Sequence, residues 1–153
     1  MGSSTASIEL HIVALVAGYT SSDQQLFQSL RKALRQRFPT LNELVYDYGK
    51  KVVIGYSPTE AGGEGLVALS LDADGVRVYL TNGSKLPDPH KLLQGKAGAR
   101  YLTPSSSNDL VRPEVEALMA ATEKLSKMPV PAMGSGQTII KATAAAKRSG
   151  KKE

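Results

Sequence analysis

The sequence predicts an α+β fold, in which an antiparallel β-sheet of about five strands is covered by two or three α-helices. Two observations indicate this class. Apolar residues recur at helical spacing before residue 40 and again after residue 110, whereas short β-prone runs separated by turn residues fill the chain between them. The length of 153 residues is enough for one domain with a core of its own.

The first two segments are expected to be helices. Residues 6–17 place apolar side chains at helical spacing, although their β-branched content leaves a strand as the alternative. Residues 22–38 give a clearer apolar stripe, with Ser22 as the expected N-cap and Pro39 as the stop. The outer face of this second helix is expected to carry four cationic side chains: Arg31, Lys32, Arg35 and Arg37.

Strand-like runs follow in the middle of the chain. They are Glu43–Tyr48, Lys51–Tyr56, Leu66–Asp72, Val76–Leu80 and Arg100–Thr103. The third run is apolar on nearly both sides, which indicates a central strand. Between the third and fourth runs, Ala73, Asp74 and Gly75 predict a hairpin turn, because Asp and Gly tolerate positive φ.

A third helix is expected near the C-terminal end, from Val111 to about Ser126. Asn108 or Asp109 can cap this helix, and Pro113 is tolerated in its first turn. With this helix, the order of elements is helix, helix, antiparallel strands, loop, strand and helix.

The chain is expected to divide into three parts. Residues 1–126 form a single α+β domain, residues 127–136 form a Pro/Gly linker, and residues 137–153 form a short β-prone run followed by a basic, flexible tail. The sequence leaves open whether residues 137–143 dock as an edge strand. The linker and the last part together carry the net charge of +5, because residues 127–153 hold six basic side chains and one acidic one, whereas the body before them is neutral.

The loop before the last predicted strand carries a family resemblance. Its sequence, GSKLPDPHKLLQG, resembles the G-x-x-L-P-D-P-x-x-L-L-x-G pattern of the YdhG-like family of domains of unknown function. The matching positions are Gly83, Leu86, Pro87, Asp88, Pro89, Leu92, Leu93 and Gly95. Arg100 lies where the family's strand arginine falls, and the likeness extends over residues 22–148. One position departs from the pattern, since Gly49 stands where members usually have an aromatic residue.

This resemblance implies an antiparallel sheet covered by helices. It also implies one kind of function, because some relatives are described as frataxin-like iron chaperones. Such proteins hold hard cations loosely through clustered surface carboxylates. Candidate pairs here are Asp47 with Glu43 and Glu60 with Glu64. Iron is therefore the one metal that the resemblance allows, and no other cofactor is expected.

The candidate ligand-binding residues are polar side chains of the predicted strands. In a strand, Tyr46 and Tyr48 share one face and Asp47 lies on the other. The functional interpretation is a pocket wall in which phenolic hydroxyls and charged groups orient a small ligand. The alternative is that these tyrosines are amphipathic residues at the rim of the sheet. The five residues assigned to this pocket are Tyr46, Asp47, Tyr56, Tyr79 and Arg100.

The sequence contains no recognisable catalytic constellation. It has no cysteine, its only imidazoles are His11 and His90, and no Ser/His/Asp set can be assembled. The absence of cysteine suits the cytoplasm. The apolar run at Ile12–Ala17 is too short to cross a bilayer, so no membrane association is expected.

Two functions follow from these observations. The leading hypothesis is a small cytoplasmic, non-enzymatic domain that binds a small ligand or metal, as a monomer or homodimer. The alternative is a weak nucleic-acid or protein-partner binding module that uses Arg31, Arg35 and Arg37 together with the basic tail. Because the tail has no aromatic residue, base stacking by the tail is not expected.

Overall fold

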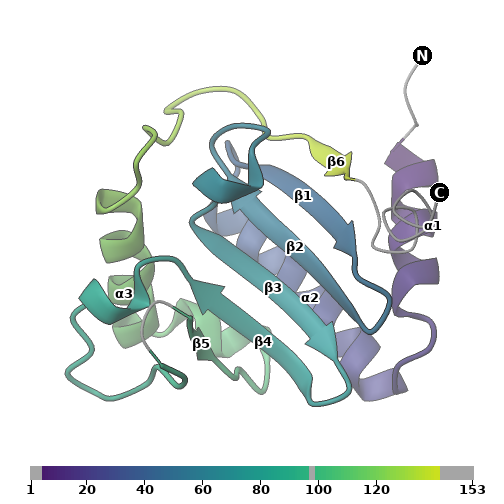
Figure 1. The fold of residues 1–153 in the computed structure, drawn as a ribbon, viewed down its shortest axis with the longest axis horizontal. Coiled ribbons are helices and arrows are strands. Elements are labelled where there is room, and N and C mark those ends of the chain that lie inside the picture. The colour runs from purple at the N-terminus through teal and green to yellow at the C-terminus, as the bar shows by residue number, and fades with distance from the viewer. Residues whose placement is uncertain (1–4, 97–98, 142–153) are drawn as a thin grey trace, which may run out of the picture.

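The computed structural model describes residues 5–96 and 99–141. Within these residues, the chain folds into a six-stranded sheet with three α-helices (Figure 1). The α+β class predicted from the sequence is therefore confirmed. No helix among these residues is long and apolar enough to span a membrane.

The first two helices are α1 (Thr5–Val16) and α2 (Ser21–Arg37). The first segment is thus a helix and not the alternative strand. The predicted N-cap of α2 is wrong, because the cap is Thr20 and not Ser22. The Thr20 backbone is extended and its hydroxyl oxygen accepts a hydrogen bond from the Asp23 backbone N–H at 3.1 Å. The helix ends before Phe38 and Pro39, as expected.

The third helix, α3 (Pro113–Lys124), begins later than predicted. Residues 107–111 form a 3₁₀ turn, and Arg112 precedes the helix without a side-chain cap. The cap assigned to Asn108 or Asp109 is therefore wrong. The Asp109 carboxylate accepts hydrogen bonds from the backbone N–H and the hydroxyl of Ser105 instead, at 2.8 and 3.0 Å.

The strands are β1 (Asn42–Asp47), β2 (Lys51–Ser57), β3 (Val67–Asp72), β4 (Gly75–Leu80), β5 (Arg100–Leu102) and β6 (Thr138–Ile140). The first five lie within one residue of their predicted bounds. Their order across the sheet is β5-β4-β3-β2-β1-β6. The first five pair antiparallel, and the turn between β3 and β4 uses Gly75 at a φ of +111°.

Strand β6 pairs with β1 in parallel, with Thr138 opposite Glu43. The question that the sequence left open is thereby answered, since residues 138–140 form an edge strand. This strand belongs to the same sheet although it follows the predicted linker. The division of the chain into a domain, a linker and a tail otherwise stays a prediction.

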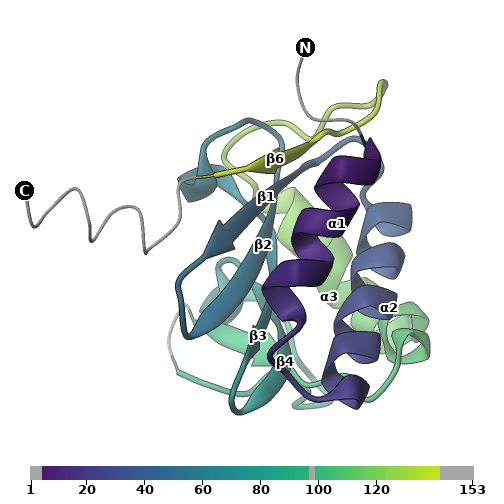
Figure 2. The same cartoon turned by 90° about the vertical axis from the view of Figure 1, so that its right-hand side faces the viewer.

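All three helices lie on one face of the sheet (Figures 1 and 2). The α2 side chains Phe27, Leu30 and Leu34 are fully buried against strand residues such as Ile54 and Leu69. We call this side the covered face and the opposite side the open face. The β1–β5 registers assign alternate residues of each strand to the two faces.

In the loop that carries the family resemblance, the motif residues Asp88, Leu86, Leu92 and Leu93 stabilise the loop itself. The Asp88 carboxylate accepts hydrogen bonds from the backbone N–H groups of Leu92 and Leu93, at 2.8 and 2.9 Å. Leu86 is buried, and Leu92 and Leu93 pack against the core. The motif therefore fixes a long connection between β4 and β5.

Candidate ligand-binding groove

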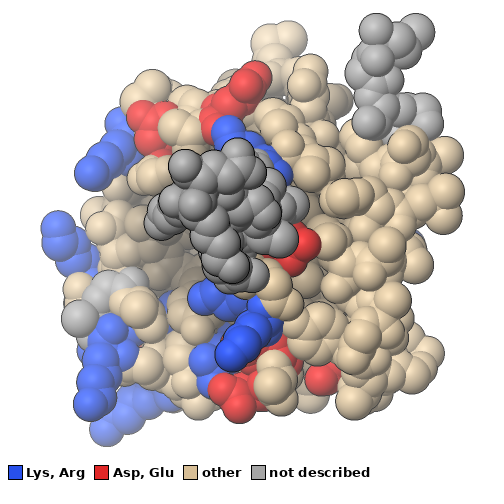
Figure 3. Space-filling view, turned by 45° about the vertical axis from the view of Figure 1, so that its right-hand side comes forward, with Lys and Arg blue, Asp and Glu red and all other residues tan. Residues whose placement is uncertain are grey.

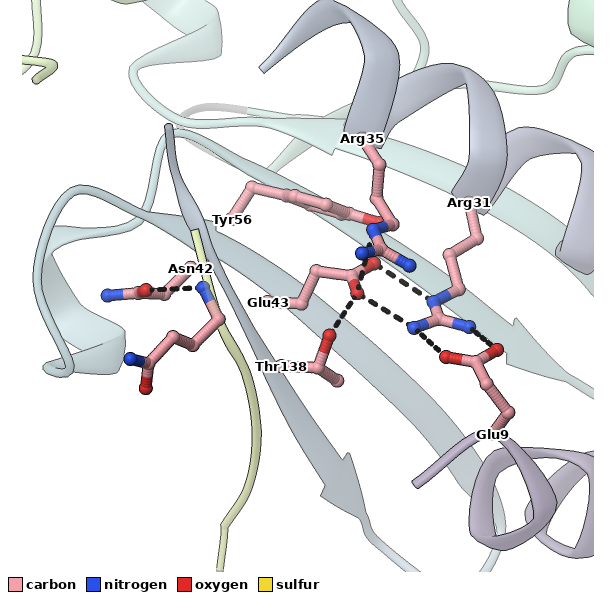
Figure 4. Close-up of polar contacts among 8 residues, drawn as sticks. Glu9, Arg31, Arg35, Asn42, Glu43, Tyr56 and Thr138 are labelled. Carbon is pink, nitrogen blue, oxygen red and sulfur yellow. Dashed lines mark hydrogen bonds and ion pairs between the residues drawn. The ribbon is translucent and has the colours of Figure 1, made fainter. Parts of the chain in front are cut away.

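The most unusual side chain of α2 is Arg31, which is buried. It lies between Glu9 of α1 and Glu43 of β1 (Figure 4). Its two terminal nitrogens donate to the Glu9 carboxylate at 2.5 and 2.8 Å. It also donates to Glu43 at 3.0 and 2.9 Å. Only 3% of Arg31 is exposed, so its predicted place on the outer face of α2 is wrong.

Glu43 joins this arginine to two further elements. Its carboxylate accepts the hydroxyl of Tyr56 from β2 and the hydroxyl of Thr138 from β6, each at 2.8 Å. The Arg35 Nε lies 3.6 Å from the same carboxylate. A buried carboxylate requires several such partners, because an unpaired buried charge costs several kcal/mol. We call Glu9, Arg31, Glu43, Tyr56 and Thr138 the buried network.

The network shifts the protonation equilibria of its members. Burial, followed by the negative charge of Glu43, raises the pKa of Tyr56 well above its ordinary value. Burial disfavours charged Arg31, but its hydrogen bonds to Glu9 and Glu43 outweigh this effect and raise its pKa. The hydrogen bond from Arg31 lowers the pKa of Glu9. Tyr56 therefore stays neutral while the arginine and Glu9 stay charged at pH 7.

A groove with a volume of about 520 Å³ opens above this network, between α2 and the segment that leads into β6. We call it the α2–β6 groove. Its polar lining consists of Glu9, Gln28, Arg31, Lys32, Arg35, Gln36, Glu43, Ser135, Gln137 and Thr138. A second cavity, of about 600 Å³ between α1 and β6, shares Glu9, Arg35, Gln137 and Thr138 with it. The hollow therefore follows β6 on its helix side.

Close backbone packing holds the β6 side of the groove. A Cβ atom at Gly136 would lie 1.7 Å from the Leu41 carbonyl oxygen, so only glycine fits there. The Gly136 N–H donates to the Pro39 carbonyl at 2.8 Å. The next residue, Gln137, donates its backbone N–H to the Asn42 side chain at 2.9 Å. These contacts place Gln137 and Thr138 at the wall of the groove.

The five residues predicted as a pocket are not brought together. Tyr46 on β1 and Tyr79 on β4 lie on the open face, separated by β2 and β3. Tyr56 and Arg100 lie on the covered face, and Tyr56 is fully buried in the network. Asp47 ends β1, where its carboxylate accepts the Gly49 N–H. Among the five, only Tyr56 is connected to the groove, through Glu43.

The carboxylate pairs considered for iron are used for other contacts. Glu43 belongs to the buried network, and the Glu64 carboxylate accepts the Thr59 hydroxyl at 2.5 Å. No group of three His or acidic side chains that could hold a metal occurs in residues 5–96 and 99–141.

The arginine at the end of α2 also has a structural contact. Arg37 donates to Glu116 at 2.7 Å and forms an ion pair with Glu123, and both glutamates belong to α3. Its guanidinium also lies 4.7 Å from the centre of the Phe38 ring. Two of the three arginines assigned to a nucleic-acid surface, Arg31 and Arg37, are thus engaged within the fold.

The sequence analysis did not predict the buried network, because charged residues are usually exposed to solvent. A signal was present, since Arg31 follows Leu30 directly and lies between Phe27 and Leu34 on the apolar stripe of α2. Glu43 alternates with Val45, which is buried on the same face of β1. A charged residue within an apolar stripe, paired with an opposite charge in a neighbouring strand, predicts a buried ion pair.

No family model, curated protein or solved structure matches the chain. The fold and the groove therefore define this protein only as an α+β domain with a polar groove beside its edge strand. The YdhG-like resemblance stays a prediction.

Proposed function

We propose that this protein is a non-enzymatic domain that binds a small anionic ligand, bearing a carboxylate or phosphate group, in the α2–β6 groove. The observation that carries the proposal is the distribution of charge along the groove. Among the described residues, three cationic side chains and two carboxylates line it. Arg31 donates hydrogen bonds to both carboxylates, whereas Arg35 forms only a longer ion pair with Glu43, at 3.6 Å. Lys32 and Arg35 therefore provide positive charge at the surface of the groove.

Arg35 is the better placed of these two cations. Its side chain is 49% exposed, and its Nε approaches Glu43 at only 3.6 Å, longer than a hydrogen bond. Its guanidinium can therefore turn toward a ligand without leaving a buried charge unpaired, because Arg31 still pairs Glu43. Planar guanidinium groups bind carboxylates and phosphates through two parallel hydrogen bonds. The amides of Gln28, Gln36 and Gln137 add neutral donors and acceptors around it.

We favour binding over catalysis because the hydroxyl and carboxylate groups of the groove already take part in structural hydrogen bonds. The Thr138 hydroxyl donates to Glu43, but this carboxylate already accepts hydrogen bonds from Arg31 and Tyr56. The hydrogen bond between Thr138 and Glu43 therefore holds β6 in place. An excess of positive charge also favours an anion over an iron cation in this groove. We retain a cytoplasmic location in the proposal, because the chain has no cysteine.

The proposal is tested by thermal unfolding with phosphate and with small di- and tricarboxylates, at constant ionic strength. A ligand that binds only the folded state raises the melting temperature, and the increase grows with the logarithm of the ligand concentration above its Kd. The matched variants are Arg35→Gln in the groove and Arg112→Gln outside it. Arg112 is also half exposed and pairs with Glu114 at 2.7 Å, so both variants lose one surface arginine.

We expect at least one anion to stabilise the wild type and Arg112→Gln, and to lose most of this effect with Arg35→Gln. If no anion stabilises the wild type, or if both variants respond equally, the groove is not the binding site and the proposal is wrong.

A further inference from the structure

The open face of the sheet carries most of the tyrosines of this protein. Of the six tyrosines in the chain, four lie there: Tyr46, Tyr48, Tyr79 and Tyr101. The helices all lie on the other face (Figures 1 and 2). An open sheet with aromatic side chains is an unusual surface, because the core-facing side of a sheet normally takes the large rings.

These tyrosines form two separate pairs. On β1 and the residue after it, the Tyr46 and Tyr48 rings stack with their centres 5.7 Å apart and an angle of 8° between their planes. On β4 and β5, the Tyr79 and Tyr101 rings meet at 5.2 Å with a tilt of 51°. The pairs stand three strands apart, which corresponds to roughly 14 Å across the sheet.

The floor between the two pairs is made of one valine and three small residues. Val53 on β2 pairs with Tyr46 and with Ser70 on β3, and Gly55 on β2 pairs with Ala68 on β3. A Cβ atom added at Gly55 would meet nothing within 4 Å, so this position opens into free space. These side chains are shorter than the tyrosine rings on either side, so we call this strip of the open face the trough.

Each tyrosine pair has a cation beside it. The Arg77 guanidinium lies 4.5 Å from the centre of the Tyr101 ring and donates to the Tyr79 hydroxyl at 3.3 Å. The Lys51 ammonium lies 5.8 Å from the centre of the Tyr48 ring. Asp74 approaches Arg77 at 3.8 Å from the β3–β4 turn, which holds the arginine side chain near its strand.

From this arrangement we propose that the open face binds a single strand of nucleic acid. Bases stack on tyrosine rings and on guanidinium planes, and nearby cations attract the phosphates. The two cations next to rings make the trough complementary to a chain of that chemistry, which carries aromatic bases and negative charge at a regular spacing.

This surface is distinct from the α2–β6 groove, which lies on the covered face. It also differs from the surface expected from the sequence, which used the helix arginines and the tail. Stacking on the sheet predicts a signal that binding by basic residues alone does not give. The chain has no tryptophan, so its intrinsic fluorescence comes from tyrosine, and stacked bases quench it.

The test uses the full-length protein and a fluorescein-labelled oligouridine RNA of about 12 nucleotides. Anisotropy of the label measures binding, and tyrosine fluorescence of unlabelled samples measures stacking. Tyr48→Ala removes a ring that is 37% exposed. Arg77→Gln removes the stacked guanidinium, and Arg112→Gln is its matched control, because it lowers the net charge equally at a site on α3's N-terminal side.

We expect the single strand to quench the tyrosine fluorescence saturably. Its affinity should be about fivefold to a hundredfold weaker for Tyr48→Ala and for Arg77→Gln, and unchanged for Arg112→Gln. Three results would overturn the proposal. The first is a rise in anisotropy without tyrosine quenching, which indicates binding by the basic tail. The second is equal quenching by a duplex of the same length. The third is equal affinity of the Arg77→Gln and Arg112→Gln variants.

Discussion

Arg31 shows how a single side chain decides the local structure of this fold. It is a cation on the apolar stripe of α2. Its burial is tolerated because it donates hydrogen bonds to the carboxylates of Glu9 on α1 and Glu43 on β1. A buried ion pair adds little net stability compared with an apolar pair, but loss of one partner leaves the other buried without compensation. The three residues therefore depend on one another.

The first prediction at this scale concerns Arg31→Met. We expect this substitution to lower the free energy of unfolding by about 3–5 kcal/mol, because Glu43 loses its closest cation while it stays buried. Urea unfolding measures the change. The matched control is Lys32→Met, which removes an exposed charge from the next position of the same helix and should change stability little. Equal effects of the two substitutions would contradict a buried network.

The second prediction at this scale concerns Glu9 and pH. The Arg31 hydrogen bond lowers the pKa of Glu9 from its ordinary value of 4.5, so the folded state binds this proton less readily than the unfolded chain. Its stabilising contribution is complete above pH 4.5 and is lost as the pH falls through the folded-state pKa. Glu9→Gln should therefore lower the melting temperature at pH 7 and lower it much less near the acid limit of folding.

The control for this pH experiment is Glu60→Gln, which changes an exposed glutamate. Its melting temperature relative to the wild type should show little dependence on pH. A Glu9→Gln difference that stays constant down to acid pH would mean that the ion pair with Arg31 does not contribute to stability.

At the scale of elements, β6 is the segment on which the proposed site depends. This three-residue strand pairs with β1, and its Thr138 hydroxyl reaches the Glu43 carboxylate. It also supplies one wall of the α2–β6 groove. Strand β6 thus connects the end of the described chain to the buried network and to the groove.

We therefore predict that Gly136→Ala displaces β6. The added methyl group would lie 1.7 Å from the Leu41 carbonyl oxygen, and a backbone atom cannot move away as a flexible side chain can. Anion binding should be lost while α1–α3 and the rest of the sheet remain folded. Amide hydrogen exchange at residues 138–140 and 43–45, combined with the thermal shift by the ligand, measures both effects. Gly63→Ala is the matched control, because a Cβ atom added there would meet nothing within 4 Å, and this variant should keep both protection and binding.

The elements also show how far the sequence carries a prediction. The bounds of α2 and of the first five strands were predicted closely, because apolar residues recur with a period of 3.6 residues in a helix and of 2 residues in a strand. The caps were wrong, because Thr20 and Ser22 are equivalent by residue type and differ only in backbone conformation. The position of β6 could not be predicted, since its partner β1 lies 95 residues away and no local pattern encodes that pairing.

The candidate site was predicted less well than the fold. Tyr46, Asp47, Tyr56, Tyr79 and Arg100 were grouped by the chemistry of their side chains. Strand alternation already separates Tyr46 from Asp47, but the face of Tyr79 relative to Tyr46 depends on the register of three strand pairs. Arg31 and Glu43 were overlooked because charged residues are seldom buried.

At the scale of the whole molecule, the two faces of the sheet differ in character. The covered face holds the core, the buried network and the groove, whereas the open face carries the tyrosine pairs. Figure 3 shows that the side formed by α1 carries few charged side chains, and Leu10 and Val13 of this helix are 70% and 51% exposed. A homodimer could bury this apolar side. Light scattering of the full-length chain measures its molar mass and so decides between a monomer and a homodimer.

The central claim is that the α2–β6 groove binds an anion through Arg35. The most direct test is an amide NMR titration of the labelled full-length protein with inorganic phosphate at constant ionic strength. We predict saturable shifts of the amides of Gln28, Lys32, Arg35, Gln36 and Gln137, which disappear with Arg35→Gln. Shifts that are absent, or that spread over lysines and arginines outside the groove and persist with Arg35→Gln, would contradict the claim.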